Sequence, residues 1–424
     1  MNINGKILDI YENGKEIENR KLPEILKKYN NNNTNSSVFR IPLDLLKYNL
    51  QNGRIATFFI ENENKINSLN ELEIKNEIKN EIINSDKKSH DKTKNDIKLI
   101  GQQEPGIVLL DGTVIDGNRR FTCLLELNQE NPNQEEYKYF NAFILNSDNV
   151  DEKIIKQLEL NIQLAKDEKV NYDITDRYMD IYNVVSLQKK LTIEEYSKYS
   201  NITEKEIREI IDQIEIVKEY LVYIKKDLKW DIIKKKKKLE HFKEIWKSLN
   251  KINSKSEQNT MKQIAFDYIL CESPDADSKS IRELCTSSHK KDKNNWDLFI
   301  SNSEDLHEKI KEIIDKNEAS DFEKLESELK KEKELLHDLK SNYHDLNQNN
   351  LISNEKDKID GILKIISKKI ASLSQHWNEL EEMNASDPSR LKEIYKIINT
   401  IVNELDSKKN HIEKIMQKDS NGQF

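Results

Sequence analysis

The amino-acid sequence predicts an α+β fold, in which a strand-rich N-terminal domain is followed by an all-α region. Two short apolar runs, residues 107–110 and 113–115, flank Asp111-Gly112, a dipeptide typical of tight hairpin turns. After Asp148 the apolar residues recur at helical spacing, and heptad-like rows fill the last third of the chain. These patterns predict strands early in the chain and helices in the rest of it.

Composition narrows the possible classes of protein. Charged residues make up 34% and hydrophobic residues 36% of the 424-residue chain, which favours elongated helical parts over one large globule. The sequence has no run of about 18 apolar residues and no basic segment followed by an apolar one at its N-terminus, so we expect a cytoplasmic protein without a membrane partner. Three scattered cysteines fit a reducing compartment. Because the net charge is −8, nucleic-acid binding would require a local basic patch.

Changes of pattern along the chain predict four segments. Residues 1–35 form an N-terminal extension. Residues 36–165 form the α+β domain, with an insertion at about 61–98 that is typical of a helix followed by a flexible part around residues 86–95. Residues 166–300 form a helical domain, and residues 301–424 form a coiled-coil-like antiparallel helical hairpin or bundle.

Strands and helices alternate within the predicted α+β domain. Residues 38–42 are predicted as a strand and residues 43–48 as a short helix or turn. A helix follows Asp116-Gly117 and carries Phe121, Leu124 and Leu125 on its apolar face. Residues 139–145, rich in aromatic and β-branched side chains, are predicted as a returning strand.

Two helix starts in the helical domain match the capping box, in which a hydroxyl and a glutamate three residues later satisfy free backbone N–H groups. The pairs are Thr192 with Glu195 and Thr203 with Glu206. Two capped helices so close together predict a helix-turn-helix-like unit at residues 191–216.

Three heptad-like rows occupy the C-terminal segment. The rows are Phe322, Leu325, Leu329, Leu336, Leu339, Tyr343 and Leu346; then Ile359, Leu363, Ile366, Ile370, Leu373, Trp377 and Leu380; then Leu391, Ile394, Ile398, Ile401, Leu405, Ile412 and Ile415. They predict helices that self-associate or dock a protein partner. Glu332 and Lys408 interrupt the first and third rows.

The segment from Asp116 to Arg120 is the strongest candidate for chemistry. Gly117 permits a sharp turn into a helix, and Asn118 can cap that helix. Arg119 and Arg120 then fall in the first helical turn, where cations oppose the helix dipole unless an anion is bound there. The alternative is a solvated turn whose arginines pair with acidic neighbours.

Four segments in the expected order give the chain a resemblance to the ParB/sulfiredoxin-like family. Residues 116–120 resemble the Gly-Glu-Arg-Arg box that binds nucleotide phosphates in ParB-type partition proteins. Residues 49–54 resemble the Asn-Pro-x-Gln-Pro-Arg segment, and residues 101–108 resemble the Gly-x-x-Gln-Pro-Ile-x-Val box. Residues 161–163 resemble the Glu-Asn-x-Gln-Arg box, which contacts the triphosphate and the metal.

The resemblance implies a nucleotide-gated switch. Its ligand would be a nucleoside triphosphate, CTP first among them, with Mg²⁺, and its helical region would bind DNA or a protein partner in plasmid partition or mobile-element defence. The residues that the resemblance assigns to the nucleotide are Arg54, Gln103, Pro105, Gly117, Asn118, Arg119, Arg120, Asn161 and Gln163.

Several positions depart from the family pattern. Asn118 and Glu104 stand where the family has glutamate and glutamine, and Leu160 and Leu164 replace the residues that flank its last box. Because leucine cannot bind a hard cation, we expect slow or absent hydrolysis. The alternative is an enzyme on the same fold, a ParB-like nuclease or a nucleotide-dependent phosphotransferase. The sequence does not assign its catalytic residues, but such an enzyme needs carboxylates near the phosphates, and the candidates are Glu104, Asp116 and Glu159.

A basic run offers the candidate nucleic-acid contact. It consists of Lys234, Lys235, Lys236, Lys237 and Lys238. The second helix of the helix-turn-helix-like unit is acidic instead, which is unfavourable between phosphates. Cys271, Cys285 and His289 lack the close pairing of a zinc site, and Cys123 is interpreted as a small buried apolar residue, so we expect neither zinc nor sulfiredoxin chemistry.

Overall fold

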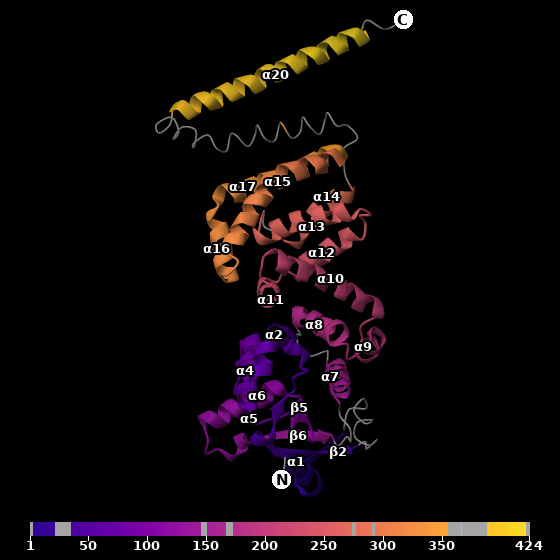
Figure 1. The fold of residues 1–424 in the computed structure, drawn as a ribbon, viewed down its shortest axis with the longest axis vertical. Coiled ribbons are helices and arrows are strands. Elements are labelled where there is room, and N and C mark those ends of the chain that lie inside the picture. The colour runs from indigo at the N-terminus through magenta and orange to yellow at the C-terminus, as the bar shows by residue number, and fades with distance from the viewer. Residues whose placement is uncertain are drawn as a thin grey trace. The chain divides into compact units, whose positions relative to one another are not determined.

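The computed structural model describes residues 3–21, 35–145, 151–166, 173–273, 277–290, 293–354 and 388–420, together with Ile366. These residues fall into two compact units, one within Met1–Lys293 and Asp297–Tyr343 and the other within Asn294–Trp296 and His344–Phe424. The first unit contains a mixed sheet and many helices (Figure 1). The fold is therefore mixed α/β, consistent with the predicted α+β class.

The described residues contain one six-stranded sheet, in the order β1-β2-β6-β4-β5-β3. The strands are β1 Glu16–Lys21, β2 Asn35–Pro42, β3 Lys47–Tyr48, β4 Gly106–Leu109, β5 Thr113–Asp116 and β6 Tyr139–Leu145. β6 lies between β2 and β4, antiparallel to the first and parallel to the second. The strands predicted at residues 38–42 and 139–145 are confirmed.

Alternating side chains give the sheet two buried faces. On one face, Phe143 and Leu145 of β6 pack with Leu158 and Ile162 of α7 (Glu152–Lys166). On the other face, Ala142 and Ile144 of the same strand join the cluster beneath α6 (Asn118–Glu130). The sheet is thus covered by helices on both sides.

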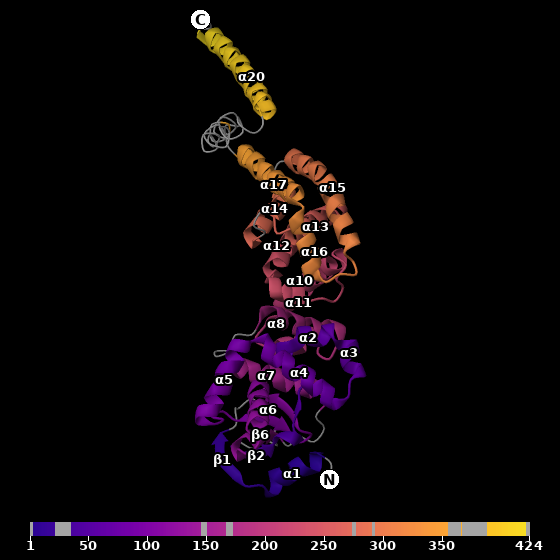
Figure 2. The same cartoon turned by 90° about the vertical axis from the view of Figure 1, so that its left-hand side faces the viewer.

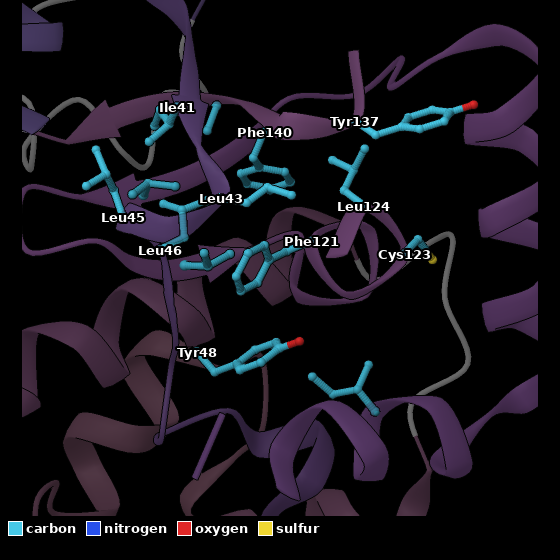
Figure 3. Close-up of a cluster of buried hydrophobic side chains, with 14 of the residues drawn as sticks. Ile41, Leu43, Leu45, Leu46, Tyr48, Phe121, Cys123, Leu124, Tyr137 and Phe140 are labelled. Carbon is cyan, nitrogen blue, oxygen red and sulfur yellow. The ribbon is translucent and has the colours of Figure 1, made fainter. Parts of the chain in front are cut away.

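An aromatic stack fixes α6 on the second face. Figure 3 shows Phe121 of α6 between Tyr48 and Phe140, with ring centroids 4.9 and 6.1 Å away respectively. Aromatic pairs in such tilted arrangements contribute about 0.5–1.5 kcal/mol each beyond the area they bury. The stack holds the first turn of α6, with its two arginines, next to the ends of the neighbouring strands.

The hairpin predicted at Asp111-Gly112 is confirmed, since β4 and β5 pair antiparallel across it. Gly112 has φ +87°, and a Cβ atom there would lie 2.2 Å from the carbonyl oxygen of Leu45. Only glycine satisfies both conditions, because other residues are strained at positive φ and carry the clashing atom. Asp111 closes the turn by accepting from the Thr113 N–H at 3.0 Å.

The predicted insertion is helical, which corrects the flexible part expected around residues 86–95. The helices before β4 are α1 Ile3–Asn13, α2 Ala56–Glu61, α3 Glu63–Ser68, α4 Glu71–Ser85 and α5 Lys87–Ile100. α4 and α5 form a hairpin that packs against α6 (Figures 1 and 2). Its apolar residues are sparse but regularly spaced, and Ile78, Ile82 and Ile97 are buried in the core.

Helices account for most of the described chain after β6. They are α7 Glu152–Lys166, α8 Ile174–Ile181, α9 Ile193–Tyr199, α10 Glu204–Tyr223, α11 Asp231–Lys236, α12 Leu239–Leu249, α13 Lys255–Leu270, α14 Ser278–Lys290, α15 Lys293–Lys316, α16 Phe322–Lys331, α17 Lys333–Asn354 and α20 Pro388–Ser420. Both capping boxes are confirmed, at the starts of α9 and α10. In the part of the chain that the structure describes, no helix is both long and apolar enough to cross a membrane.

The first heptad row belongs to two helices instead of one. α16 ends at Lys331 and α17 begins at Lys333, so Glu332 is an exposed residue at the break and no charge is buried in a seam there. The second row lies outside the described residues apart from Ile366. In α20, Ile398 and Ile401 of the third row are exposed, as is Val402 beside them, so this helix presents apolar side chains on its surface.

Candidate functional site

A cavity of about 430 Å³ in the first unit brings together residues from five separate parts of the sequence. Its charged lining residues are Arg54, Asp96, Glu104, Asp116, Arg119, Arg120 and Glu159. Its polar or small lining residues are Asn52, Ser85, Thr93, Gly101, Gln103, Gly117 and Asn118, and its apolar lining consists of Ile55, Ile82, Ile97, Ile100, Ile115 and Ile162. The cavity therefore combines guanidinium groups with an apolar wall.

The turn from β5 into α6 aims the first helical turn at this cavity. Gly117 has φ +96°, and a Cβ atom there would lie 2.8 Å from Phe140 and 2.9 Å from the guanidinium of Arg120. Gly117 is the N-cap of α6 and Asn118 is its first residue, so Asn118 does not cap the helix as expected. The backbone N–H groups of this turn have no acceptor within the helix and favour an anion.

Arg120 is held in place by two oxygens. Its guanidinium donates to Asp116 Oδ2 at 2.9 Å and to the carbonyl oxygen of Pro105 at 3.3 Å. Within the described part of the chain, the buried Nε of Arg120 and the buried Oδ1 of Asn118 have no hydrogen-bond partner. Since buried polar atoms are rarely left unpaired, these two atoms mark places where a ligand can donate or accept.

Arg119 and Arg54 lie close enough for their charges to interact. Burial lowers the pKa of Arg119, the charge of Asp86 opposes that shift, and the charge of Arg54 adds to it. The contact of Arg119 with Asp86 is 3.4 Å long, between a guanidinium nitrogen and Oδ2. Repulsion between two guanidinium groups that share a cavity is relieved by any anion bound between them.

The loop that carries Arg54 is tied to α7. Asn52 accepts from the Arg54 N–H at 3.2 Å, and the Gly53 N–H donates to Glu159 Oε1 at 2.7 Å. The other oxygen of Glu159 accepts from Lys156 Nζ at 2.8 Å. Glu159 was not among the predicted nucleotide-site residues, and it was a candidate only for the alternative of an enzyme.

A buried charge cluster continues from Glu159 into the helical region. Lys156 also pairs with Asp180 Oδ1 of α8 at 2.5 Å, and Asp180 Oδ2 accepts from the hydroxyl of Tyr196 on α9 at 2.8 Å. The side chain of Lys156 is 0% exposed. Burial by itself lowers the pKa of Lys156, but Asp180 and Glu159 raise it overall. The ammonium is therefore charged, and it neutralises carboxylates from two helices.

The structure distributes the nine predicted nucleotide-site residues unevenly. Six line the cavity: Arg54, Gln103, Gly117, Asn118, Arg119 and Arg120. Pro105 and Asn161 are not among the lining residues, although Pro105 reaches the cavity indirectly through Arg120. Asn161 and Leu160 are buried in α7. Gln163 belongs to α7, and its side chain lies outside the described part of the chain.

The basic run is largely neutralised by internal ion pairs. Lys234 pairs with Asp176 at 2.6 Å, Lys235 with Asp231 at 2.6 Å, and Lys238 with Glu272 at 3.5 Å; Lys236 pairs with Glu326. Among the described residues, Lys237 alone of the five has no ion pair. Phosphates would have to compete with carboxylates for four of the five ammonium groups.

In the described ranges of the chain, neither the cysteines nor the acidic residues form a metal site alone. The described residues contain no cluster of three or more His, Cys, Asp and Glu side chains that could hold a metal ion. Cys123 is fully buried, and burial raises the pKa of its thiol to about 12, which fits the predicted apolar role. Carboxylates on the cavity wall, such as Glu104, fit Mg²⁺ only if phosphate oxygens complete its coordination.

In comparisons with known proteins, no family model and no curated sequence matches this chain. The geometry of the cavity is therefore the principal evidence for what the site does.

Proposed function

We propose that this protein binds a nucleoside triphosphate in the cavity and passes the bound state to its helical region. The observation that carries the proposal is that Arg54, which is distant in the sequence, lines the same cavity as the adjacent pair Arg119 and Arg120 at the start of α6. A helix start combined with planar guanidinium groups is suited to phosphate oxygens. The resemblance to ParB-type proteins favours CTP as the nucleotide.

The rest of the cavity fits the uncharged part of a nucleotide. Six isoleucines supply an apolar wall for a base or a ribose ring, and Gln103 supplies an amide. Binding sites for small molecules usually combine an apolar lining with a few placed polar groups in a volume of roughly 300–1,000 Å³. The unpaired Oδ1 of Asn118 would accept from a hydroxyl or amino group of the ligand.

The buried charge cluster supports a route from the cavity to the helices. The Arg54 loop depends on Glu159, which shares Lys156 with Asp180 of α8. A change in the position of this loop on binding therefore alters the environment of an ion pair that α8 and α9 also use. We propose that the switch operates through this connection.

A protein partner is favoured over DNA for the helical region. The first half of α10 carries Glu204, Glu206, Glu209 and Asp212, and four lysines of the basic run are already paired. Both features reduce attraction to phosphates. DNA binding by Lys237 and its neighbours remains the alternative, and a steep dependence of binding on salt would reveal it.

Calorimetry with CTP, ATP and tripolyphosphate in the presence of Mg²⁺ tests the proposal. Arg119→Ala should weaken binding about 10- to 100-fold, since a hydrogen bond to a charged group contributes about 1.5–3 kcal/mol. Arg208→Ala is the matched control, because that arginine is 61% exposed on α10. Circular dichroism checks that both variants fold. No binding by the unmodified protein, or equal affinities of the two variants, would refute the proposal.

Turnover is expected to be slow or absent. One oxygen of Glu159 accepts from Gly53 and the other from Lys156, and Asp116 holds Arg120, so these carboxylates are already engaged in the structure. A general base must instead be free to accept a proton from the attacking group. Release of phosphate measured with the same nucleotides separates a switch from an enzyme.

A further inference from the structure

Asp86 occupies the single position between two helices of the insertion. It follows the last residue of α4 and precedes the first residue of α5, with φ −154° and ψ 74°. Its Oδ1 accepts from the Ser89 N–H at 3.1 Å and caps α5. Its Oδ2 accepts from the Arg119 guanidinium. One carboxylate thus ends the hairpin and reaches the proposed phosphate site.

The bond between Asp86 and Arg119 is weak for an ion pair. It is 3.4 Å long and involves one guanidinium nitrogen, whereas charge-assisted N–H···O bonds are usually about 2.7–2.9 Å and often bidentate. The side chains of Asp86 and Arg119 are 41% and 26% exposed, so water screens the pair. A phosphate group that engages Arg119 with two oxygens therefore competes with this carboxylate for the same guanidinium.

Among the described residues, Asp86 is the one carboxylate that forms an ion pair with Arg119. When a singly charged ligand replaces Asp86, Arg119 exchanges one acceptor for another of equal charge. Asp86 is the stronger competitor in this case, because its carboxylate is already attached to the chain. A di- or triphosphate carries further charge, which can reach Arg54 as well. The exchange is favourable only for a ligand with linked phosphate groups.

We infer that Asp86 is a specificity residue of the cavity, which competes with the ligand for Arg119 and so restricts binding to polyphosphates. This inference rests on the proposed nucleotide site and adds the reason for its selectivity. Displacing Asp86 also removes one of the contacts between the α4–α5 hairpin and α6.

Asp86→Asn is the informative variant, because asparagine caps helices as well as aspartate does but carries no charge. The probes are orthophosphate, pyrophosphate and tripolyphosphate. Removing the competitor should raise the affinity for tripolyphosphate about two- to fivefold, as expected for a partly exposed ion pair. It should also make orthophosphate binding measurable. Asp91→Asn is the matched control, since it removes the same charge from an exposed position on α5.

The outcomes separate this inference from the function on which it rests. If tripolyphosphate binds the unmodified protein and requires Arg119, but Asp86→Asn binds no more tightly than Asp91→Asn, the role of Asp86 is wrong and the nucleotide site stands. If tripolyphosphate does not bind, or binds equally well after Arg119→Ala, both proposals fail. A gain specific to Asp86→Asn supports both.

Discussion

Replacing Lys156 with methionine tests whether the buried cluster stabilises the fold. The change keeps most of the side-chain volume but removes a charge that pairs with Glu159 at 2.8 Å and Asp180 at 2.5 Å. Removing one partner of a buried pair costs about 3–5 kcal/mol. The variant can avoid an unpaired buried charge by protonating one carboxylate. Protonation costs about 1.36 kcal/mol for each pH unit above an ordinary glutamate pKa of about 4.3. The expected loss at pH 7.5 is therefore about 4 kcal/mol.

The loss should shrink as the pH falls. Burial raises the pKa of Glu159 and Lys156 lowers it, so without Lys156 the folded-state pKa of Glu159 lies further above its unfolded value, and between these two values the folded variant binds a proton that the unfolded chain does not. Stability then decreases as the pH rises through this window, and the defect at pH 5.5 should be about 2–3 kcal/mol smaller than at pH 7.5.

Urea denaturation at both pH values, followed by circular dichroism, measures this effect. Lys153→Met is the control, because Lys153 lies on the same helix but is 44% exposed in its pair with Glu195, and it should leave stability almost unchanged. Adding Glu159→Gln and Asp180→Asn to Lys156→Met should recover part of the loss. A defect below about 1 kcal/mol at pH 7.5, or one that does not change with pH, would refute the reasoning.

Three further predictions concern other parts of the chain. Gly112→Ala should lower the free energy of unfolding by roughly 1–3 kcal/mol, because it places a Cβ against Leu45 at positive φ, and a milder effect in urea denaturation would contradict the hairpin geometry. A hydrogen bond to Asp267 raises the pKa of His307. The stabilisation that protonated His307 gives to the folded state is therefore complete below the unfolded histidine pKa of about 6.5, and it is lost as the pH rises through the higher folded value. His307→Gln should flatten this part of the pH–stability profile. Deleting residues 355–424 should reduce self-association, and light scattering that finds identical monomers for both proteins would argue against a role of α20 in it.

Local signals in the sequence predicted the elements that depend on local physics. The hairpin at Gly112 follows from a positive φ that the dipeptide encodes, and the capped starts of α9 and α10 follow from pairs three residues apart. The gathering of Arg119 and Arg120 at a helix start was likewise visible from the sequence. Each of these features depends on side chains that are only a few positions apart in the sequence.

Features that depend on distant partners were not predictable in the same way. α5 looked flexible because its apolar residues are few, yet Ile97 is buried against a core that only the tertiary structure supplies. Glu159 joins the cavity because Gly53, 106 residues earlier, donates to it. The lysines from Lys234 onward were predicted as a nucleic-acid contact, but their carboxylate partners lie as far away in the sequence as Glu326. Pairing across such separations leaves no periodic signal.

The position of β6 in the sheet has a consequence for synthesis of the chain on the ribosome. β6 is the last strand in sequence but joins β2 on one side and β4 on the other. Until residue 145 has been made, the β1–β2 pair and the β4–β5 pair have no common neighbour, and each exposes an unpaired edge. Chains arrested before this point carry edges prone to association, because unpaired strands and uncovered apolar faces invite aggregation. The cavity described above has two lining residues, Glu159 and Ile162, that follow β6 in the chain, so its folding must wait until this strand has been made.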